Sequence, residues 1–209
     1  QGGQTGESRF NKGGYYRCPR PEVAAHVPKF ARRVLDCGCG GGEFGRSLKE
    51  RGIEEVVGIE VVERAYEIAK TNLDRAYHGS IEDMELPFDE RYFDCIVFAD
   101  VLEHLVEPAE ALRKIAPCLT EDGLVIISIP NIRFWQQVQM HIEGRWHYED
   151  AGIMDRTHLR FFCRADLEEL IEAAGLELVR LAPLTIWPEE RLPRDENGCI
   201  QLGKATIGP

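Results

Sequence analysis

The sequence predicts a single α/β domain in which helices cover both faces of a doubly wound, mostly parallel sheet. Short apolar strands alternate with amphipathic helices at the spacing of strand–helix–strand units, which is the pattern of a parallel sheet. The first of these strands runs directly into a glycine-rich turn at 36–42. With 209 residues, the chain is long enough for one such domain with a substantial core, and a second full domain is not expected.

Each expected strand is a short apolar run bounded by glycine, proline or charged residues. These runs lie at 33–37, 55–60, 75–78, 93–99, 123–130 and 176–181. Each expected helix repeats apolar side chains every three or four positions, as Phe44 and Leu48 do before the stop at Gly52. After a first short helix that ends at Val27, the helices are expected at 43–51, 62–73, 107–119 and 165–174.

The segments outside this alternation define the expected domain organisation. Residues 1–30 are expected to form an arm and a helix over the ligand site, and residues 31–182 the core. Within the core, the aromatic stretch 131–162 is expected to be an insertion that caps the carboxyl edge of the sheet. The tail at 183–209 either supplies a last strand irregularly or is cut from a longer protein, and Gln1 with the glycine after it is typical of a tag remnant.

Charge and cysteine content narrow the class of protein. A net charge of −11 with scattered Lys and Arg argues against a nucleic-acid partner, because phosphate binding needs a basic footprint. No apolar run approaches the ~20 residues that cross a bilayer, and no secretory signal is visible. The seven cysteines are odd in number and form no Cys-x-x-Cys pair, so we interpret them as reduced thiols of a cytoplasmic protein.

The glycine-rich turn is the strongest chemical signal. Glycines at 38, 40 and 42 allow a sharp turn and let backbone approach a ligand without interference from a Cβ. The helix that follows points its N-terminal amides at the same place. Glu60 ends the next strand 20 residues after Gly40, where a carboxylate accepts hydrogen bonds from two ribose hydroxyls. The turn therefore predicts a ligand with a ribose.

Two acidic residues indicate that this ligand carries positive charge instead of a pyrophosphate. Glu43 stands at the third glycine position of the dinucleotide pattern, where a carboxylate would repel phosphate. Asp36 stands two residues before Gly38, where dinucleotide sites keep an apolar residue. An acidic group at this position suits a ligand that carries an ammonium and a sulfonium. A nicotinamide-dependent dehydrogenase is therefore the disfavoured alternative.

At this point five motifs carry a resemblance to a known family. They are VLDCGCGGG at 34–42, VVGIE at 56–60, GSIE at 79–82, FDCIVFADVLEHL at 93–105 and LTEDGLVIISIPN at 119–131. With them the chain resembles the class I S-adenosylmethionine-dependent methyltransferases over about residues 30–182. The resemblance implies a Rossmann-like methyltransferase fold, with S-adenosylmethionine as methyl donor and S-adenosylhomocysteine as product.

The resemblance also implies which residues hold the donor. Asp36 and the glycines would line the methionine end, Glu60 the ribose, and Ser80–Glu82 the adenine, while Asp100 would lie beside the methyl group. Ser80 departs from the acidic residue often found at its position. The full expected donor set is Tyr15, Tyr16, Asp36, Gly38, Gly40, Gly42, Phe44, Glu60, Val61, Ser80, Ile81, Glu82, Ala99 and Asp100.

A narrower resemblance concerns the acceptor. PRPEVAAHVP at 19–28 and the segment 155–178 resemble bacterial methyltransferases associated with sugar modification. This implies O-methylation of a small-molecule acceptor, a sugar or nucleotide-sugar. Aromatic faces stack on sugars, and among the aromatic residues of the insertion Trp146 or Tyr148 is the candidate contact, while the others are expected to pack. Another small-molecule or nitrogen acceptor and a non-catalytic donor-binding domain remain alternatives, and the oligomeric state stays open.

His158 is the first candidate for a general base, since a hydroxyl is a poor nucleophile near neutral pH. Asp155, three residues earlier, is expected to orient it, and His104 is a second catalytic candidate. An alternative is a divalent metal held by Asp100, Glu103, His104 and His158, similar to the arrangement in methyltransferases acting on small-RNA ends and quinone precursors. A metal is not predicted, because many relatives with the same motif need none and the four side chains need not face one point.

Overall fold

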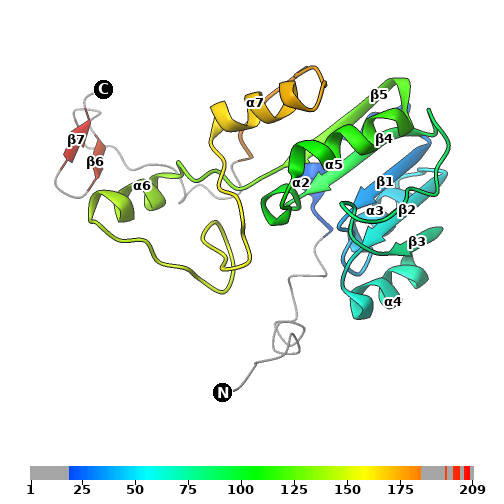
Figure 1. Ribbon diagram of the computed structural model, residues 1–209, viewed down its shortest axis with the longest axis horizontal. Coiled ribbons are helices and arrows are strands. Elements are labelled where there is room, and N and C mark those ends of the chain that lie inside the picture. Colours follow the sequence, from blue (N-terminus) through cyan, green and yellow to red (C-terminus); the bar gives the residue numbers. More distant parts are fainter. Residues whose placement is uncertain (1–18, 185–195, 197–199, 203–204, 208–209) are drawn as a thin grey trace. The chain divides into compact units, whose positions relative to one another are not determined.

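A computed structural model describes residues 19–184, 196, 200–202 and 205–207 (Figure 1). The chain divides into two compact units, which we call the sheet unit (1–102 with 107–128) and the insertion unit (103–106 with 129–209). The expected core, 31–182, is therefore shared between them. Among the described residues, no helix has the length and apolar character needed to cross a bilayer.

The sheet unit is built on five parallel strands in the order β3-β2-β1-β4-β5. They are β1 (Arg33–Cys37), β2 (Glu55–Glu60), β3 (Arg75–His78), β4 (Phe93–Ala99) and β5 (Leu119–Ser128). The strand order reverses between β1 and β4, and ligands of open α/β sheets bind beyond the carboxyl ends of the strands at such a point. The expected fold class is confirmed.

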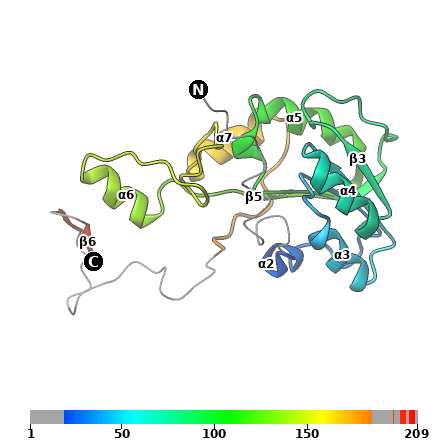
Figure 2. The same cartoon turned by 90° about the horizontal axis from the view of Figure 1, so that it is seen from below.

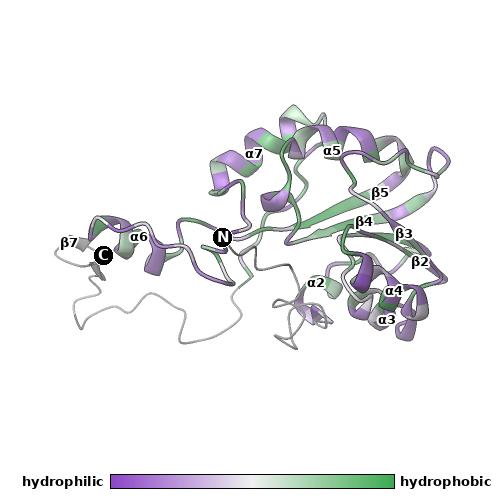
Figure 3. Cartoon of the chain, turned by 60° about the horizontal axis from the view of Figure 1, so that its bottom comes forward, coloured by the Kyte–Doolittle hydropathy of each residue, from purple (hydrophilic) through white to green (hydrophobic). Residues whose placement is uncertain are grey.

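Helices cover both faces of this sheet. Figure 2 shows α5 on one side of β5, and α2 and α3 on the other. Neighbouring residues on one strand, such as Val34 and Leu35, are both fully buried, because each faces a helical layer. Figure 3 shows β4 and β5 as hydrophobic, whereas the helices carry many hydrophilic residues. These helices are α2 (Pro21–Ala24), α3 (Glu43–Glu50), α4 (Glu63–Asn72) and α5 (Pro108–Ile115).

Most expected boundaries in the sheet unit agree with the structure within one or two residues, and the largest difference follows α5. The helix expected to reach 119 ends at Ile115, and a 3-10 turn covers Ala116–Cys118. Pro117 explains this early end, because proline has no N–H to donate to the carbonyl four residues earlier. β5 begins at once at Leu119, four residues before the expected start.

The insertion unit contains α6 (Trp135–Ile142), α7 (Arg164–Ala173) and a hairpin of β6 (Ile200–Leu202) with β7 (Ala205–Ile207). The strand expected at 176–181 was wrong, since that segment forms no strand in the structure. Three of its apolar residues, Leu178, Val179 and Leu181, are exposed, Val179 by 75%. Apolar character alone does not supply the paired neighbour that a strand needs.

The described cysteines are free thiols. Cys37, Cys39, Cys95 and Cys118 are buried and act as small apolar side chains, whereas Cys163 is half-buried. Cys18 and Cys199 lie outside the described residues.

Candidate active site

The glycine turn after β1 adopts left-handed backbone at its three expected positions. The φ angles are +70° at Gly38, +54° at Gly40 and +79° at Gly42. The N–H groups of Gly38 and Cys39 both donate to the carbonyl of Ile59, at 2.8 and 3.1 Å. The end of β2 therefore holds the turn in place, and the turn leads directly into α3.

Gly38 is required for space as well as for its backbone angle. A Cβ at this position would lie 2.6 Å from Cγ2 of Val101, well inside van der Waals contact. We expect Gly38→Ala to lower the free energy of unfolding by roughly 1–3 kcal/mol more than Gly52→Ala does in urea denaturation. Gly52 also has a positive φ, +97°, but open space around its Cβ. Equal losses for the two variants would show that the clash relaxes at no cost.

Asp36 is the next-to-last residue of β1, and its side chain is buried, with 2% of the residue exposed. Its Oδ2 atom has no hydrogen-bond partner among the described residues. Burial, together with the charge of the neighbouring Glu60, raises the pKa of Asp36 to about 8, although Arg20 acts in the opposite direction. A buried carboxyl with an unsatisfied oxygen is costly unless a cation or donor meets it, so the position suits an ammonium or sulfonium group.

Glu60 links the end of β2 to the glycine turn. Its Oε2 accepts a hydrogen bond from the N–H of Gly40 at 2.7 Å, and its Oε1 accepts one from Val62 at 2.8 Å. Each carboxylate oxygen has a second lone pair for a further donor. Glu60 is therefore held in one orientation at the carboxyl edge of the sheet, where it can also accept from ribose hydroxyls.

The segment after β3 lies beside Glu60. The N–H of Gly79 donates to the Glu60 carbonyl at 3.0 Å, and Ile81 is buried. The hydroxyl oxygen of Ser80 accepts from the N–H of Glu82 at 3.2 Å. The carboxylate of Glu82 accepts from the N–H of Glu107, the residue before α5, at 2.7 Å. Glu82 therefore fastens this segment to α5 with its side chain.

The other expected donor residues have varied positions. Phe44 is buried in the core that α3 and α4 form with the sheet. Val61 is exposed beside Glu60, and Ala99 is half-buried at the end of β4. Tyr15 and Tyr16 lie outside the described residues.

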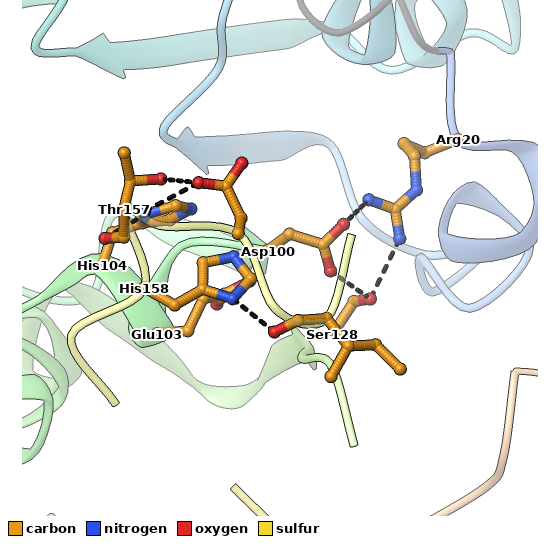
Figure 4. A network of polar contacts seen from close by, with 9 residues as sticks. Arg20, Asp100, Glu103, His104, Ser128, Thr157 and His158 are labelled. Atoms are coloured by element: carbon orange, nitrogen blue, oxygen red, sulfur yellow. Dashed lines mark hydrogen bonds and ion pairs between the residues drawn. The ribbon is translucent and has the colours of Figure 1, made fainter. Parts of the chain in front are cut away.

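Sequence reasoning missed a network around Asp100 in the sheet unit (Figure 4). The guanidinium of Arg20 forms an ion pair with Asp100 and donates to the hydroxyl of Ser128 at 3.0 Å. That hydroxyl donates to Oδ1 of Asp100 at 3.1 Å. Arg20 and Asp100 both have positive φ angles, +44° and +58°, an unusual conformation for non-glycine residues that is common at functional sites. The one sequence signal was Arg20 between two prolines.

The insertion unit brings two imidazoles and a carboxylate together, also drawn in Figure 4. The rings of His104 and His158 are 4.8 Å apart, edge to face, and Nε2 of His158 lies 3.9 Å from Oε1 of Glu103. One ligand atom from each of the three residues lies within 4.8 Å of the others. Glu103 is only 1% exposed, and His158 is buried.

The Nδ1 atoms of both imidazoles lie at backbone carbonyls. Nδ1 of His158 lies 2.9 Å from the carbonyl of Ile153, and Nδ1 of His104 lies 3.2 Å from that of Thr157. A carbonyl only accepts, so each Nδ1 carries the proton and each Nε2 keeps its lone pair. His158 can therefore accept a proton at Nε2, and the cluster of Glu103, His104 and His158 can alternatively hold a divalent cation.

Asp155 does not orient His158 in the way its spacing suggested. Its carboxylate accepts hydrogen bonds from the N–H and the hydroxyl of Thr157, at 2.7 and 2.5 Å. The carbonyl of Ile153 orients the imidazole instead. Asp155 shapes the turn, because its own carbonyl accepts from the N–H of His158 at 2.9 Å. A short carboxylate satisfies nearby backbone donors first.

The aromatic residues of the insertion pack on one another. Trp146 stacks on His141 with a centroid separation of 4.8 Å and meets the edge of Phe161. It remains 51% exposed, and Tyr148 is 42% exposed. These two side chains therefore combine packing with accessible aromatic faces.

Comparison with known proteins connects this geometry to a family. A family model described as a methyltransferase domain matches residues 13–181. Two similar curated proteins are ubiquinone biosynthesis O-methyltransferases. The one from Neisseria meningitidis (serogroup A) is 28% identical over 174 residues, 78% of this chain and 71% of that protein. The one from Aeromonas salmonicida is 30% identical over 162 residues, 72% of this chain and 65% of that protein.

Solved structures show the same fold. A SAM-dependent methyltransferase from Archaeoglobus fulgidus superposes with a TM-score of 0.62 at 21% identity, covering 87% of this chain and 86% of that one. One from Thermotoga maritima gives 0.61 at 24% identity, covering 78% and 72%. At these identities the likeness concerns the fold alone.

The described residues fit the donor of such enzymes. The unsatisfied oxygen of Asp36 suits an ammonium group, and the left-handed glycine turn lets backbone approach it. Because the family model covers most of the 209 residues, the chain belongs to the methyltransferase-domain family of S-adenosylmethionine-dependent methyltransferases.

Proposed function

We propose that this protein transfers the methyl group of S-adenosylmethionine to a hydroxyl oxygen of a small molecule. The observation that carries the proposal is the pair of buried carboxyl groups, Asp36 and Glu60, on either side of the glycine turn. The names of its relatives, O-methyltransferases of ubiquinone biosynthesis, support oxygen as the acceptor atom. They lend no support to the sugar or nucleotide-sugar acceptor expected from the sequence.

Each part of the donor has a partner of suitable chemistry in the sheet unit. Asp36 would accept from the ammonium, Glu60 from the ribose hydroxyls, and the segment 79–82 would bind the adenine. Asp100, held by Arg20, is assigned to a place beside the methyl group. When bound, the donor supplies an electrophilic methyl carbon, so the protein contributes mainly orientation and exclusion of water.

His158 is assigned as the general base. Its Nε2 has an available lone pair because Nδ1 donates to Ile153. Accepting the proton of the acceptor hydroxyl at Nε2 would make that oxygen more nucleophilic. The carboxylate of Glu103, 3.9 Å from Nε2, would stabilise the positive charge that the ring then carries.

A second candidate is a metal-assisted reaction, which the cluster of Glu103, His104 and His158 favours. One carboxylate and two imidazoles with anchored Nδ1 atoms are a donor set that transition-metal ions accept. A divalent ion held there would act as a Lewis acid toward an acceptor hydroxyl. Asp100 is not part of this set, because Arg20 and Ser128 already bind it in the sheet unit.

An acceptor screen tests the proposed function. The protein is incubated with S-adenosylmethionine and panels of phenols, sugars and nucleotide-sugars, and amines, with release of S-adenosylhomocysteine and the methylated product followed by mass spectrometry. We expect turnover with hydroxyl acceptors and none without an acceptor. Methylation of amines alone would contradict the oxygen assignment, and donor binding without turnover on any panel would favour a non-catalytic domain.

Removal of metal ions by a chelator distinguishes general-base catalysis by His158 from the metal-assisted reaction. Since His158 needs no metal to accept a proton, we expect dialysis against EDTA to leave the turnover rate within about twofold. A larger loss, with recovery after addition of Zn²⁺, Mn²⁺ or Mg²⁺, would replace the base by the second candidate. Protein mock-dialysed without chelator is the control.

A further inference from the structure

Two side chains fasten the segment after β3 to α5. Besides the bond from Glu82 to the N–H of Glu107, the ammonium of Lys114 donates to two consecutive carbonyls, those of Ile81 and Glu82, each at 3.0 Å. Lys114 belongs to the last turn of α5 and is half-buried. The segment after β3 is therefore bound to α5 near both the N-terminus and the C-terminus of that helix.

These bonds set the orientation of two peptide planes. In a trans peptide the C=O and the following N–H point in opposite directions. With the carbonyls of Ile81 and Glu82 turned toward Lys114, the N–H groups of Glu82 and Asp83 turn away from it. Both then bind Ser80, at its hydroxyl oxygen (3.2 Å) and its carbonyl (3.2 Å) respectively. Lys114 and Ser80 therefore hold the turn between them.

This arrangement leaves the Ser80 hydroxyl proton for another partner. Its oxygen already accepts from the N–H of Glu82, so the hydroxyl hydrogen is available to donate. The segment runs alongside Glu60, because the N–H of Gly79 donates to the Glu60 carbonyl at 3.0 Å. A base attached to a ribose at Glu60 would therefore lie near this turn.

We infer that Lys114 is a positioning residue that fixes the turn 80–83 for recognition of the adenine ring, with the Ser80 hydroxyl donating to N1. The inference rests on the proposed function, since it requires the donor to bind at Glu60. An O–H donor at this position selects adenine over hypoxanthine, because hypoxanthine carries a proton on N1 where adenine has a lone pair. Lys114 controls this selectivity without contacting the ligand.

Binding of two product analogues tests the inference without any acceptor. Dissociation constants of S-adenosylhomocysteine and S-inosylhomocysteine are measured by calorimetry for wild type, K114Q and K114M. Loss of two charge-assisted hydrogen bonds is expected to weaken S-adenosylhomocysteine binding about tenfold in K114M, and to bring the two analogues closer in affinity. K114Q keeps one donor and is expected to fall between the other two proteins.

Lys70→Met is the matched control, because this exposed lysine of α4 pairs with Glu67 and lies over the Tyr66 ring, and its replacement removes the same charge. It should leave both affinities unchanged. A general loss of structure would lower the affinity for both analogues equally, whereas loss of positioning lowers the affinity for S-adenosylhomocysteine more. Wild-type affinity and selectivity in K114M, or equal weakening of both analogues, would overturn the inference. Failure of wild type to bind S-adenosylhomocysteine would instead overturn the proposed function.

Discussion

Replacing Asp36 by asparagine is expected to weaken S-adenosylhomocysteine binding by about a hundredfold and, at the same time, to stabilise the ligand-free protein. A charged carboxylate facing an ammonium in a buried site contributes several times more than a neutral amide, which sets the size of the loss. The unsatisfied Oδ2 shows that no described residue supplies this partner. Calorimetric titration of the wild type and D36N with S-adenosylhomocysteine measures the difference.

The same substitution changes stability in the opposite direction. Burial raises the pKa of Asp36 to about 8 in the folded protein, far above that of an unfolded aspartate. Between about pH 4 and pH 8 the folded state therefore binds more protons than the unfolded state, and the free energy of unfolding falls as pH rises. Asparagine removes this penalty, so we expect D36N to be more stable at pH 8 by roughly 1–3 kcal/mol.

The pH dependence of ligand binding should carry the same signature. The ammonium favours the charged form of Asp36, so binding below pH 8 requires loss of a proton. Affinity is expected to rise from pH 6 to pH 8 by up to about tenfold per pH unit in wild type and to stay flat in D36N. A pH-independent affinity in both proteins would contradict the assignment of Asp36 to the ammonium.

Asp74→Asn provides a contrast of opposite sign. Burial of Asp74 is outweighed by hydrogen bonds from Lys49 and from the N–H of Val56, which lower its pKa. Stability from this residue is therefore present above the pKa of the unfolded aspartate and lost on acidification. Asn at 74 should destabilise the protein at neutral pH without changing ligand affinity. Stabilisation by D74N would show that replacing a carboxylate stabilises the protein whatever the direction of its pKa shift.

The first four strands were predictable from the sequence because each has marked ends. β1 ends at the glycine turn and β2 ends at Glu60, so the residues that mark the ends of these strands are also residues of the candidate site. The 176–181 strand failed for the converse reason, since an apolar run says nothing about which neighbour it pairs with.

The candidate site was predictable where one strand end supplies the group, and less so where remote residues combine. Arg20 and Asp100 are 80 residues apart, and no local pattern indicates their ion pair. Asp155 shows a different limit of sequence reasoning. A spacing of three residues predicted that its carboxylate contacts His158, but the carboxylate accepts a hydrogen bond from the nearer Thr157 instead. Glu103, weighed only as a metal ligand, proved to be the buried acid beside His158. The burial of Glu103 follows from the tertiary fold, which no local pattern in the sequence indicates.

Replacing His158 is expected to have the largest effect on turnover. Removal of a general base lowers kcat by about a hundredfold to ten-thousandfold. His158→Asn is the sharper variant, because the asparagine amide can still donate to the Ile153 carbonyl but cannot accept the proton. The affinity for S-adenosylhomocysteine should be unchanged, because the proposed donor residues lie in the sheet unit. His147→Ala, an exposed histidine of the same segment, is the matched control and should retain the wild-type rate.

Comparison with Glu103→Gln and His104→Ala then separates a base from a metal ligand. If His158 is the base, Glu103 stabilises the charge on its ring, and His104 packs against that ring, 4.8 Å away, without taking the proton. Their replacement should then lower kcat by about tenfold or less, well short of the loss in H158N. Ligands of one ion act as a unit, so three losses of equal size that do not add in double variants would indicate a metal site. Turnover of H158N at the wild-type rate would exclude His158 as the general base, because the asparagine cannot accept the proton.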